Sequence, residues 1–214
     1  MRVITENRKG NNVNCYIIDI TEVMKRKALK FADGIILSNN QYSRLVPDVA
    51  KTDPELQQKL EIQRTYVGKL GELAFLEYLH YHHFYPNIED MFKIYPGQGN
   101  TDGFDFEING RSIDIKTGFR PIHKKLLINM QQFTNTPKNF YVAVHLNGKD
   151  SHSEQKTIDL NSITEATIKG YADWYDLNNQ DDNVGNFGEG LAKFRDYNRL
   201  FGIDGLLNQL GLTR

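Results

Sequence analysis

Two aspartates and a lysine stand close together in one predicted β-hairpin of the sequence. Residues 104–117 contain two alternating runs joined by Asn109 and Gly110, a pair typical of a two-residue type I′ turn. Counting outward from this turn places Asp105 opposite Asp114, in a pair whose side chains approach closely. Two carboxylates about 5 Å apart repel by roughly 3 kcal/mol at an effective dielectric near 20. A divalent cation removes this penalty, and Mg²⁺ prefers such hard oxygen ligands.

The same alternation sorts the hairpin into an apolar and a polar face. Lys116 follows Asp114 by two residues, so both project from the polar face and an ammonium lies beside the predicted metal. A second interpretation stays open, in which this is a solvated face and Lys116 partly neutralises its acidic neighbours. The apolar face is expected in the core and consists of Phe104, Phe106, Ile108, Ile113 and Ile115.

Asp105 followed by Asp114-Ile115-Lys116 resembles the signature of the PD-(D/E)XK nucleases, the restriction-endonuclease-like superfamily. In that family a preceding helix often contributes a glutamate, and Glu72 is the match here. The sequence departs from the pattern at Phe104, where the family's name expects proline. The resemblance covers roughly residues 60–146 and rests on short motifs in a characteristic order.

The resemblance implies an α/β fold with a restriction-endonuclease-like core, a mixed central β-sheet flanked by helices. It implies that Asp105, Asp114 and the Ile115 carbonyl bind Mg²⁺, and that Glu72 holds a second metal or a water. It also implies that Lys116 orients the attacking water. The implied catalytic residues are therefore Glu72, Asp105, Asp114 and Lys116. If the hairpin register slips, Asp102 takes the place of Asp105.

The implied activity is that of a Mg²⁺-dependent endonuclease acting on double-stranded DNA. A type II restriction enzyme that cuts a short specific site is the first hypothesis, because the chain is one nuclease-sized domain. A phage or DNA-repair nuclease of the same fold is the alternative, and a non-catalytic DNA-binding module is a third. Restriction enzymes of this size are commonly symmetric dimers, so the resemblance also implies a homodimer.

Length and composition predict one globular domain, residues 1–214, with the nuclease core at roughly 53–146 and elaborations at both ends. No stretch is apolar enough for a membrane span or a signal peptide, so we expect no membrane partner. A lone cysteine, Cys15, fits a reducing cytosol, and we expect a cytoplasmic protein. The net charge of −1 is not a global polyanion-binding signature, so DNA contacts must come from local basic patches.

One such patch begins at Lys116 and runs to Lys125, with four cations and no anion. Beside a metal it would contact phosphates, although an ordinary basic loop is the alternative. Asn129, Gln131 and Gln132, which follow, have the amide chemistry that reads adenine edges. The residues predicted to contact DNA are Arg120, Lys124, Lys125, Asn129 and Gln131.

The remaining elements follow from periodicity and from turn residues. Asp53 and Pro54 predict the start of a long helix that ends near His83, in which Gly68 and Gly71 would permit a close approach to the sheet. Other helices are predicted at 22–31 and 191–201, a loop at 178–190, and strands at 14–20, 91–95, 126–128, 140–146 and 168–174. The apolar residues Phe201, Leu206, Leu207 and Leu210 form either a dimer interface or part of the core.

Overall fold

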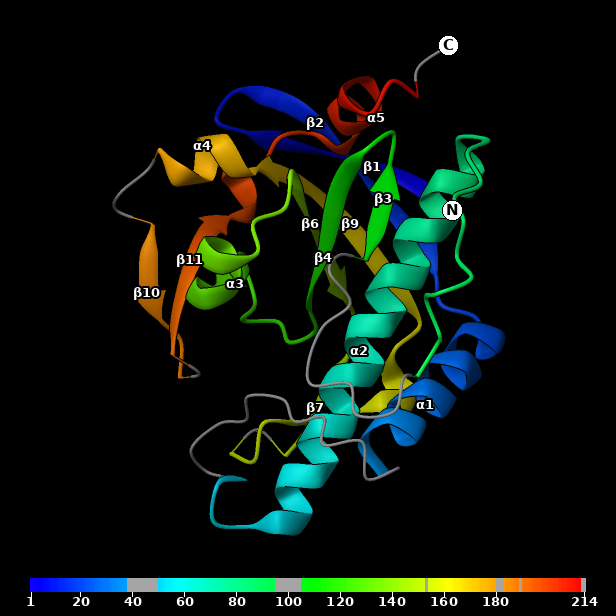
Figure 1. Cartoon of the computed structure of the whole chain (residues 1–214), viewed down its shortest axis with the longest axis vertical. Helices are drawn as coiled ribbons and strands as arrows, with labels where there is room; N and C mark the ends of the chain where they lie inside the picture. The colour runs from blue at the N-terminus through cyan, green and yellow to red at the C-terminus, as the bar shows by residue number, and fades with distance from the viewer. Residues whose placement is uncertain (38–49, 95–104, 153, 180–182, 189, 213–214) are drawn as a thin grey trace.

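The computed structural model of the protein describes residues 1–37, 50–94, 105–152, 154–179, 183–188 and 190–212. A six-stranded sheet lies at its centre, in the order β1-β2-β9-β6-β4-β3 (Figure 1). Neighbouring strands are antiparallel except β4 and β6, which run parallel, so the sheet is mixed, as predicted. Its strands are β1 (Arg2–Arg8), β2 (Asn11–Asp19), β3 (Phe106–Ile108), β4 (Arg111–Gly118), β6 (Phe140–Leu146) and β9 (Glu165–Asp173).

Helices and two small sheets surround the central sheet. The helices are α1 (Glu22–Leu37), α2 (Pro54–Tyr81), α3 (Met130–Asn135), α4 (Trp174–Asn178) and α5 (Ile203–Gln209), with 3₁₀ turns η2 (Leu160–Ser162) and η3 (Tyr197–Arg199). The strands β5 (Lys125–Asn129), β10 (Val184–Asn186) and β11 (Leu191–Asp196) form one small sheet, and β7 (Lys149–His152) and β8 (Thr157–Asp159) form the other. Within the described ranges, no helix combines the length and the apolar character needed to cross a bilayer.

The central sheet separates two apolar clusters. Val142 and Val144 of β6 belong to the larger cluster, in which α1, α2 and α5 pack against one face. The alternate β6 side chains, Tyr141 and Ala143, pack on the other face with residues of β5, α3 and α4. Because β6 is covered on both faces, its sequence is almost continuously apolar.

The long helix α2 begins where the sequence predicts it. The Asp53 carboxylate accepts the Leu56 N–H at 3.0 Å, and Pro54 occupies the first turn. Further along, α2 lies directly against β4, since a Cβ added to Gly71 would stand only 2.0 Å from Thr117 Oγ1. The predicted close approach is therefore confirmed at Gly71.

The hairpin has the predicted turn and the predicted register. Asn109 and Gly110 have φ angles of 51° and 71°, the left-handed conformation that a type I′ turn requires. The observed pairs are Ile108 with Arg111, Glu107 with Ser112 and Phe106 with Ile113. The apolar face of the described hairpin lies in the larger cluster, as expected.

The hairpin ladder stops one pair before the predicted pair of Asp105 and Asp114. The Asp105 N–H donates to the Ile113 carbonyl at 3.1 Å, and the Asp105 carboxylate accepts the Ile115 N–H at 2.6 Å. The Asp105 carboxylate thus accepts the Ile115 N–H, which would donate to a β3 carbonyl if the ladder continued. Asp105 and Asp114 are therefore not ladder partners. Phe104 and Asp102 lie outside the described residues.

The C-terminal region differs most from the sequence prediction. Residues 191–201 form β11 and η3 instead of a helix, because β11 pairs with β5 on one side and β10 on the other. The strand β10 itself lies in the segment predicted as a loop. Leu206, Leu207 and Leu210 are buried in the larger cluster, so they belong to the core and not to a dimer interface, whereas Phe201 is partly exposed.

Three features before the hairpin also differ from the prediction. The strand β1 was not predicted, although β2 lies where a strand was expected. Helix α1 continues past the predicted end at residue 31, through Asp33 and Gly34, to Leu37, and the Thr21 hydroxyl accepts the Met24 N–H at its start. A Cβ at Gly34 would stand 2.7 Å from Ile94, so this glycine permits packing and does not end the helix. In place of the predicted strand, residues 91 and 92 lie in a turn and 93 and 94 in irregular structure, while residue 95 lies outside the described residues.

Candidate active site

The four residues predicted for catalysis converge at the open end of the β3–β4 hairpin, although three separate segments supply them. Alternation along β4 turns Asp114 and Lys116 away from the larger apolar cluster. Glu72 comes from α2, and Asp105 immediately precedes β3. Asp105 lies close enough to Glu72 and Asp114 for both carboxylates to affect its ionisation. We call Glu72, Asp105 and Asp114 the carboxylate cluster.

The ionisation of Asp105 is strongly perturbed. Burial raises its pKa well above the ordinary value, and the neighbouring charges of Glu72 and Asp114 raise it further. The Ile115 N–H and the Lys116 ammonium act in the opposite direction without cancelling this effect. A carboxyl group in such surroundings needs a proton or a cation beside it.

Two lysines partner the other members of the cluster. The Lys116 ammonium lies 2.7 Å from Asp114 Oδ2 and donates to the side-chain oxygen of Gln132, on α3, at 3.1 Å. The Lys69 ammonium lies 2.6 Å from Glu72 Oε2 and also donates to the Met91 carbonyl at 2.8 Å. Each lysine is therefore held by an acidic and a neutral acceptor, so both ammonium positions are well defined.

Lys69 and Lys138 are members of the site that the sequence analysis missed. The Lys69 side chain is only 6% exposed and its ammonium lies 4.5 Å from the centre of the Phe31 ring. Burial lowers the pKa of Lys138, and this ammonium is close enough to Asp114 and Lys116 to interact with both. The spacing of three residues between Lys69 and Glu72 on one helix is a usable sequence signal. Lys138 has no comparable local signal.

The donor atoms at this site suit Mg²⁺, which prefers hard oxygens. Three carboxylates are available, and the Ile115 N–H points at Asp105, so the carbonyl of the same strand residue lies along the same edge of β4. Among the described residues, no three His, Cys, Asp or Glu side chains are spaced to hold a metal ion. In the structure the Lys69 ammonium lies beside Glu72, and the Lys116 ammonium lies beside Asp114.

The predicted DNA contacts divide into engaged and exposed side chains. The Arg120 guanidinium donates to both carboxylate oxygens of Asp150, at 2.9 and 3.2 Å. Lys125 pairs with Asp196 at 2.5 Å and lies over the Phe194 ring. These bonds fix the loop and β5, so the two cations have a structural role within the fold.

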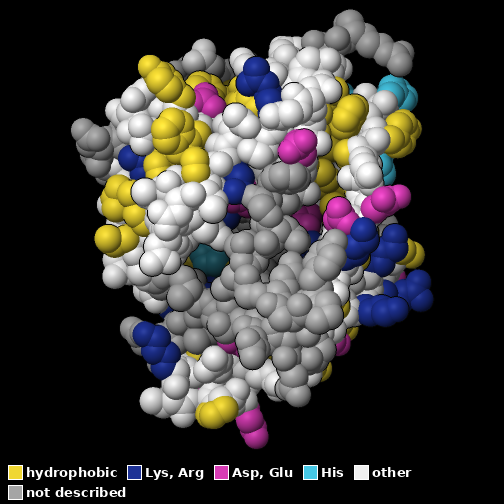
Figure 2. All heavy atoms as spheres, in the orientation of Figure 1, with side chains coloured by type: hydrophobic (Ala, Val, Ile, Leu, Met, Phe, Trp, Pro, Cys, Tyr) yellow, Lys and Arg dark blue, Asp and Glu magenta, His cyan; other side chains and the backbone are white. Residues whose placement is uncertain are grey.

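The other three candidates lie at the start of α3 and in the loop before β5. The Asn129 side-chain oxygen caps α3 by accepting the Gln131 and Gln132 N–H groups, so its amide is partly used locally. Lys124 and the Gln131 side chain are exposed. Because Gln132 also contacts Lys116, α3 and the carboxylate cluster form one continuous polar region. Figure 2 shows acidic and basic side chains side by side near the centre of the face turned to the viewer.

Comparison with protein-family models, curated proteins and solved structures found no match for this chain. The α/β class and the mixed sheet come from the structure itself. Membership of the PD-(D/E)XK superfamily stays a prediction.

Proposed function

We propose that the protein is a Mg²⁺-dependent endonuclease with a PD-(D/E)XK-type site that hydrolyses double-stranded DNA. The supporting observation is the convergence of Glu72, Asp105, Asp114 and Lys116 from α2 and the β3–β4 hairpin, with an Asp105 pKa raised by burial and by its acidic neighbours. Perturbed ionisation of clustered groups is a frequent property of active sites. Three neighbouring carboxylates repel one another, so this arrangement needs positive charge to offset the repulsion.

Each residue of the site has a task in this proposal. Asp105, Asp114 and the Ile115 carbonyl would hold Mg²⁺, which supplies Lewis acidity and neutralises charge that develops on the phosphate oxygens. Lys116 is fixed between Asp114 and Gln132, where it orients the attacking water and stabilises the transition state. Glu72 accepts hydrogen bonds from water on the α2 side. Hydrolysis breaks the P–O3′ bond and leaves a 5′-phosphate and a 3′-hydroxyl.

The decisive experiment uses a long DNA of known sequence, in supercoiled and linear form, with Mg²⁺ or with EDTA. We expect Mg²⁺-dependent cleavage, with ends that map to one short sequence if the protein is a restriction enzyme. Scattered ends would favour the phage or repair nuclease instead. Unchanged DNA at every Mg²⁺ concentration would refute the nuclease proposal.

The ion pairs of Glu72 with Lys69 and of Asp114 with Lys116 favour one second candidate, a non-catalytic DNA-binding module. In that case the lysines neutralise the carboxylates permanently and no cation enters. Isothermal calorimetry distinguishes the two functions, because only the nuclease binds Mg²⁺ with an affinity that falls when Asp114 is replaced.

Cleavage of both strands at one site favours a symmetric assembly. We therefore propose a homodimer that recognises a palindromic sequence, since protein and DNA symmetry tend to match. Light scattering with and without DNA tests this directly. A monomer that nicks one strand per encounter would contradict the dimer and would favour a repair or phage role.

A further inference from the structure

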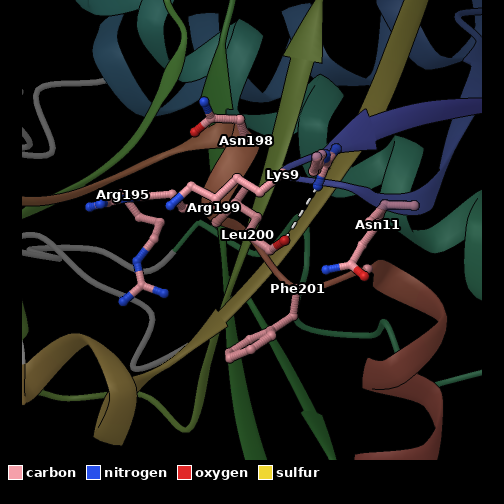
Figure 3. Close-up of a pocket in the computed structure, with 10 residues that line it drawn as sticks. Lys9, Asn11, Arg195, Asn198, Arg199, Leu200 and Phe201 are labelled. Carbon is pink, nitrogen blue, oxygen red and sulfur yellow. Dashed lines mark hydrogen bonds between the residues drawn. The ribbon is translucent and has the colours of Figure 1, made fainter.

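A cationic cavity lies away from the carboxylate cluster, between the β1–β2 turn and the segment that follows β11. Its volume is about 580 Å³. One wall contains Arg8, Lys9 and Asn11, and the other contains Asn198 and Arg199 (Figure 3). The Arg8 guanidinium donates to the Leu200 carbonyl across the gap, at 3.5 Å, so the two walls are tied together.

The charges around this cavity are strongly unbalanced. Its lining includes four cations, Arg8, Lys9, Arg195 and Arg199, and no acidic residue among the described ones. Arg8 pairs with Glu6 and Arg195 pairs with Asp176, so these two buried arginines are neutralised.

Lys9 and Arg199 are exposed cations, one on each wall, and have no ion-pair partner among the described residues. The excess is therefore two positive charges, flanked by the amides of Asn11 and Asn198. Such a set of donors, arranged on two sides of a cavity, matches an anion with several oxygens.

The backbone holds both walls in place. Lys9 and Gly10 have φ angles of 50° and 87°, so a tight left-handed turn presents Lys9 at the rim. On the opposite wall, the Tyr197 N–H donates to the Lys124 carbonyl at 3.0 Å. A Cβ at Gly118 would stand 2.7 Å from the Tyr197 hydroxyl. The segment that carries Arg199 is thus anchored both to the end of β4 and to the basic loop before β5.

We propose that this cavity binds a backbone phosphate of the same DNA duplex, at a distance from the cleaved bond. The choice of DNA as the source of the phosphate rests on the proposed function, whereas the preference for an oxyanion rests on the four side chains alone. Lys9 and Arg199 supply the charge, and Asn11 and Asn198 supply neutral N–H donors. The contact positions the duplex without reading its sequence.

The test measures DNA binding in EDTA, so that cleavage plays no part. Fluorescence anisotropy of a labelled duplex compares wild type with Lys9→Ala/Arg199→Ala and with Arg26→Ala/Lys27→Ala. The second double variant removes the same charge from exposed positions on α1. We expect the cavity variant to bind about tenfold more weakly, with a slope of log K against log salt reduced by about 0.9, and the α1 variant to bind as wild type. Equal losses in both variants, or no loss in either, would overturn the proposal.

A second arm identifies the source of the phosphate. Inorganic phosphate and adenosine 5′-monophosphate are titrated by calorimetry into wild type and the cavity variant. Tight binding of either small anion to wild type, with unchanged duplex binding by the cavity variant, would contradict a DNA contact. If wild type cleaves no DNA but the cavity variant alone loses duplex binding, the proposed catalysis fails and the phosphate site stands.

Discussion

The contact of Gly71 with Thr117 sets how closely α2, and therefore Glu72, approaches β4. A Cβ at position 71 would stand 2.0 Å from Thr117 Oγ1, and the Thr117 Cβ and methyl group are only 3.1 and 3.2 Å away. Rotation of the threonine side chain therefore does not clear the space. Overpacking of this kind costs up to about 3 kcal/mol, whereas glycine to alanine in a helix gains about 1 kcal/mol. We expect Gly71→Ala to destabilise the protein by about 2 kcal/mol.

A double-mutant cycle tests this origin of the destabilisation. The Thr117 hydroxyl has no hydrogen-bond partner among the described residues, so Thr117→Ala removes the 2.0 Å overlap and the 3.2 Å methyl contact without removing a bond, and leaves only the Cβ contact at 3.1 Å. In that background Gly71→Ala should be close to neutral, which gives a coupling energy of about 2 kcal/mol. Urea unfolding measures all of these variants, and the single Gly71→Ala should lower the melting temperature by about 4–8 °C. An equal cost of Gly71→Ala in the wild-type and Thr117→Ala backgrounds would refute the steric argument.

Three further predictions concern the carboxylate cluster and Lys116. Asp114→Ala should abolish Mg²⁺-dependent cleavage, measured on gels, and weaken Mg²⁺ binding, measured by calorimetry. The control Glu107→Ala removes an exposed carboxylate of the same hairpin and should keep both cleavage and Mg²⁺ binding. Lys116→Ala should retain DNA binding and lose more than about tenfold in cleavage rate, a barrier increase above about 1.4 kcal/mol, and a smaller loss would contradict its catalytic role. Because the pKa of Asp105 is raised in the folded state, the protein should become less stable as pH rises above about 3.9, the ordinary pKa of an aspartate. Without divalent ions, Asp105→Asn should therefore flatten the decline in melting temperature between about pH 4 and 8. Parallel curves of melting temperature against pH for the variant and wild type would contradict this.

Local signals explain which parts of the structure the sequence predicts well. The hairpin follows from Asn109 and Gly110 because a two-residue turn determines the register of both strands. The start of α2 follows from Asp53 and Pro54 for the same kind of reason, since caps act within one turn. These two elements carry the four predicted catalytic residues. The position of Glu72 beside the hairpin was expected only from the family resemblance, because no local signal in α2 indicates which strand this helix contacts.

The regions predicted wrongly depend on contacts distant in sequence. In β11, Phe194 and Arg195 pair with Leu127 and Leu126 of β5, some seventy positions away, and nothing within residues 191–201 indicates this partner. Lys138 joins the site only because the loop after α3 folds back toward Asp114. The same limitation applies to the cationic cavity, whose walls come from opposite ends of the chain.

The early end of the hairpin ladder connects the fold with the proposed chemistry. Within an antiparallel ladder a strand residue exchanges its N–H and carbonyl with its partner, so both groups of Ile115 would be consumed by a longer β3. Here the Asp105 carboxylate takes that N–H instead, which brings a third carboxylate to the edge where the Ile115 carbonyl also lies. On its other edge β4 keeps its parallel partner β6, so the strand stays rigid at Asp114 and Lys116. The hairpin thus brings acidic side chains and the Ile115 carbonyl together because its pairing stops before Asp105. A regular extension of β3 through Asp105 would remove this grouping, although Glu72, Asp105, Asp114 and Lys116 would all still be present.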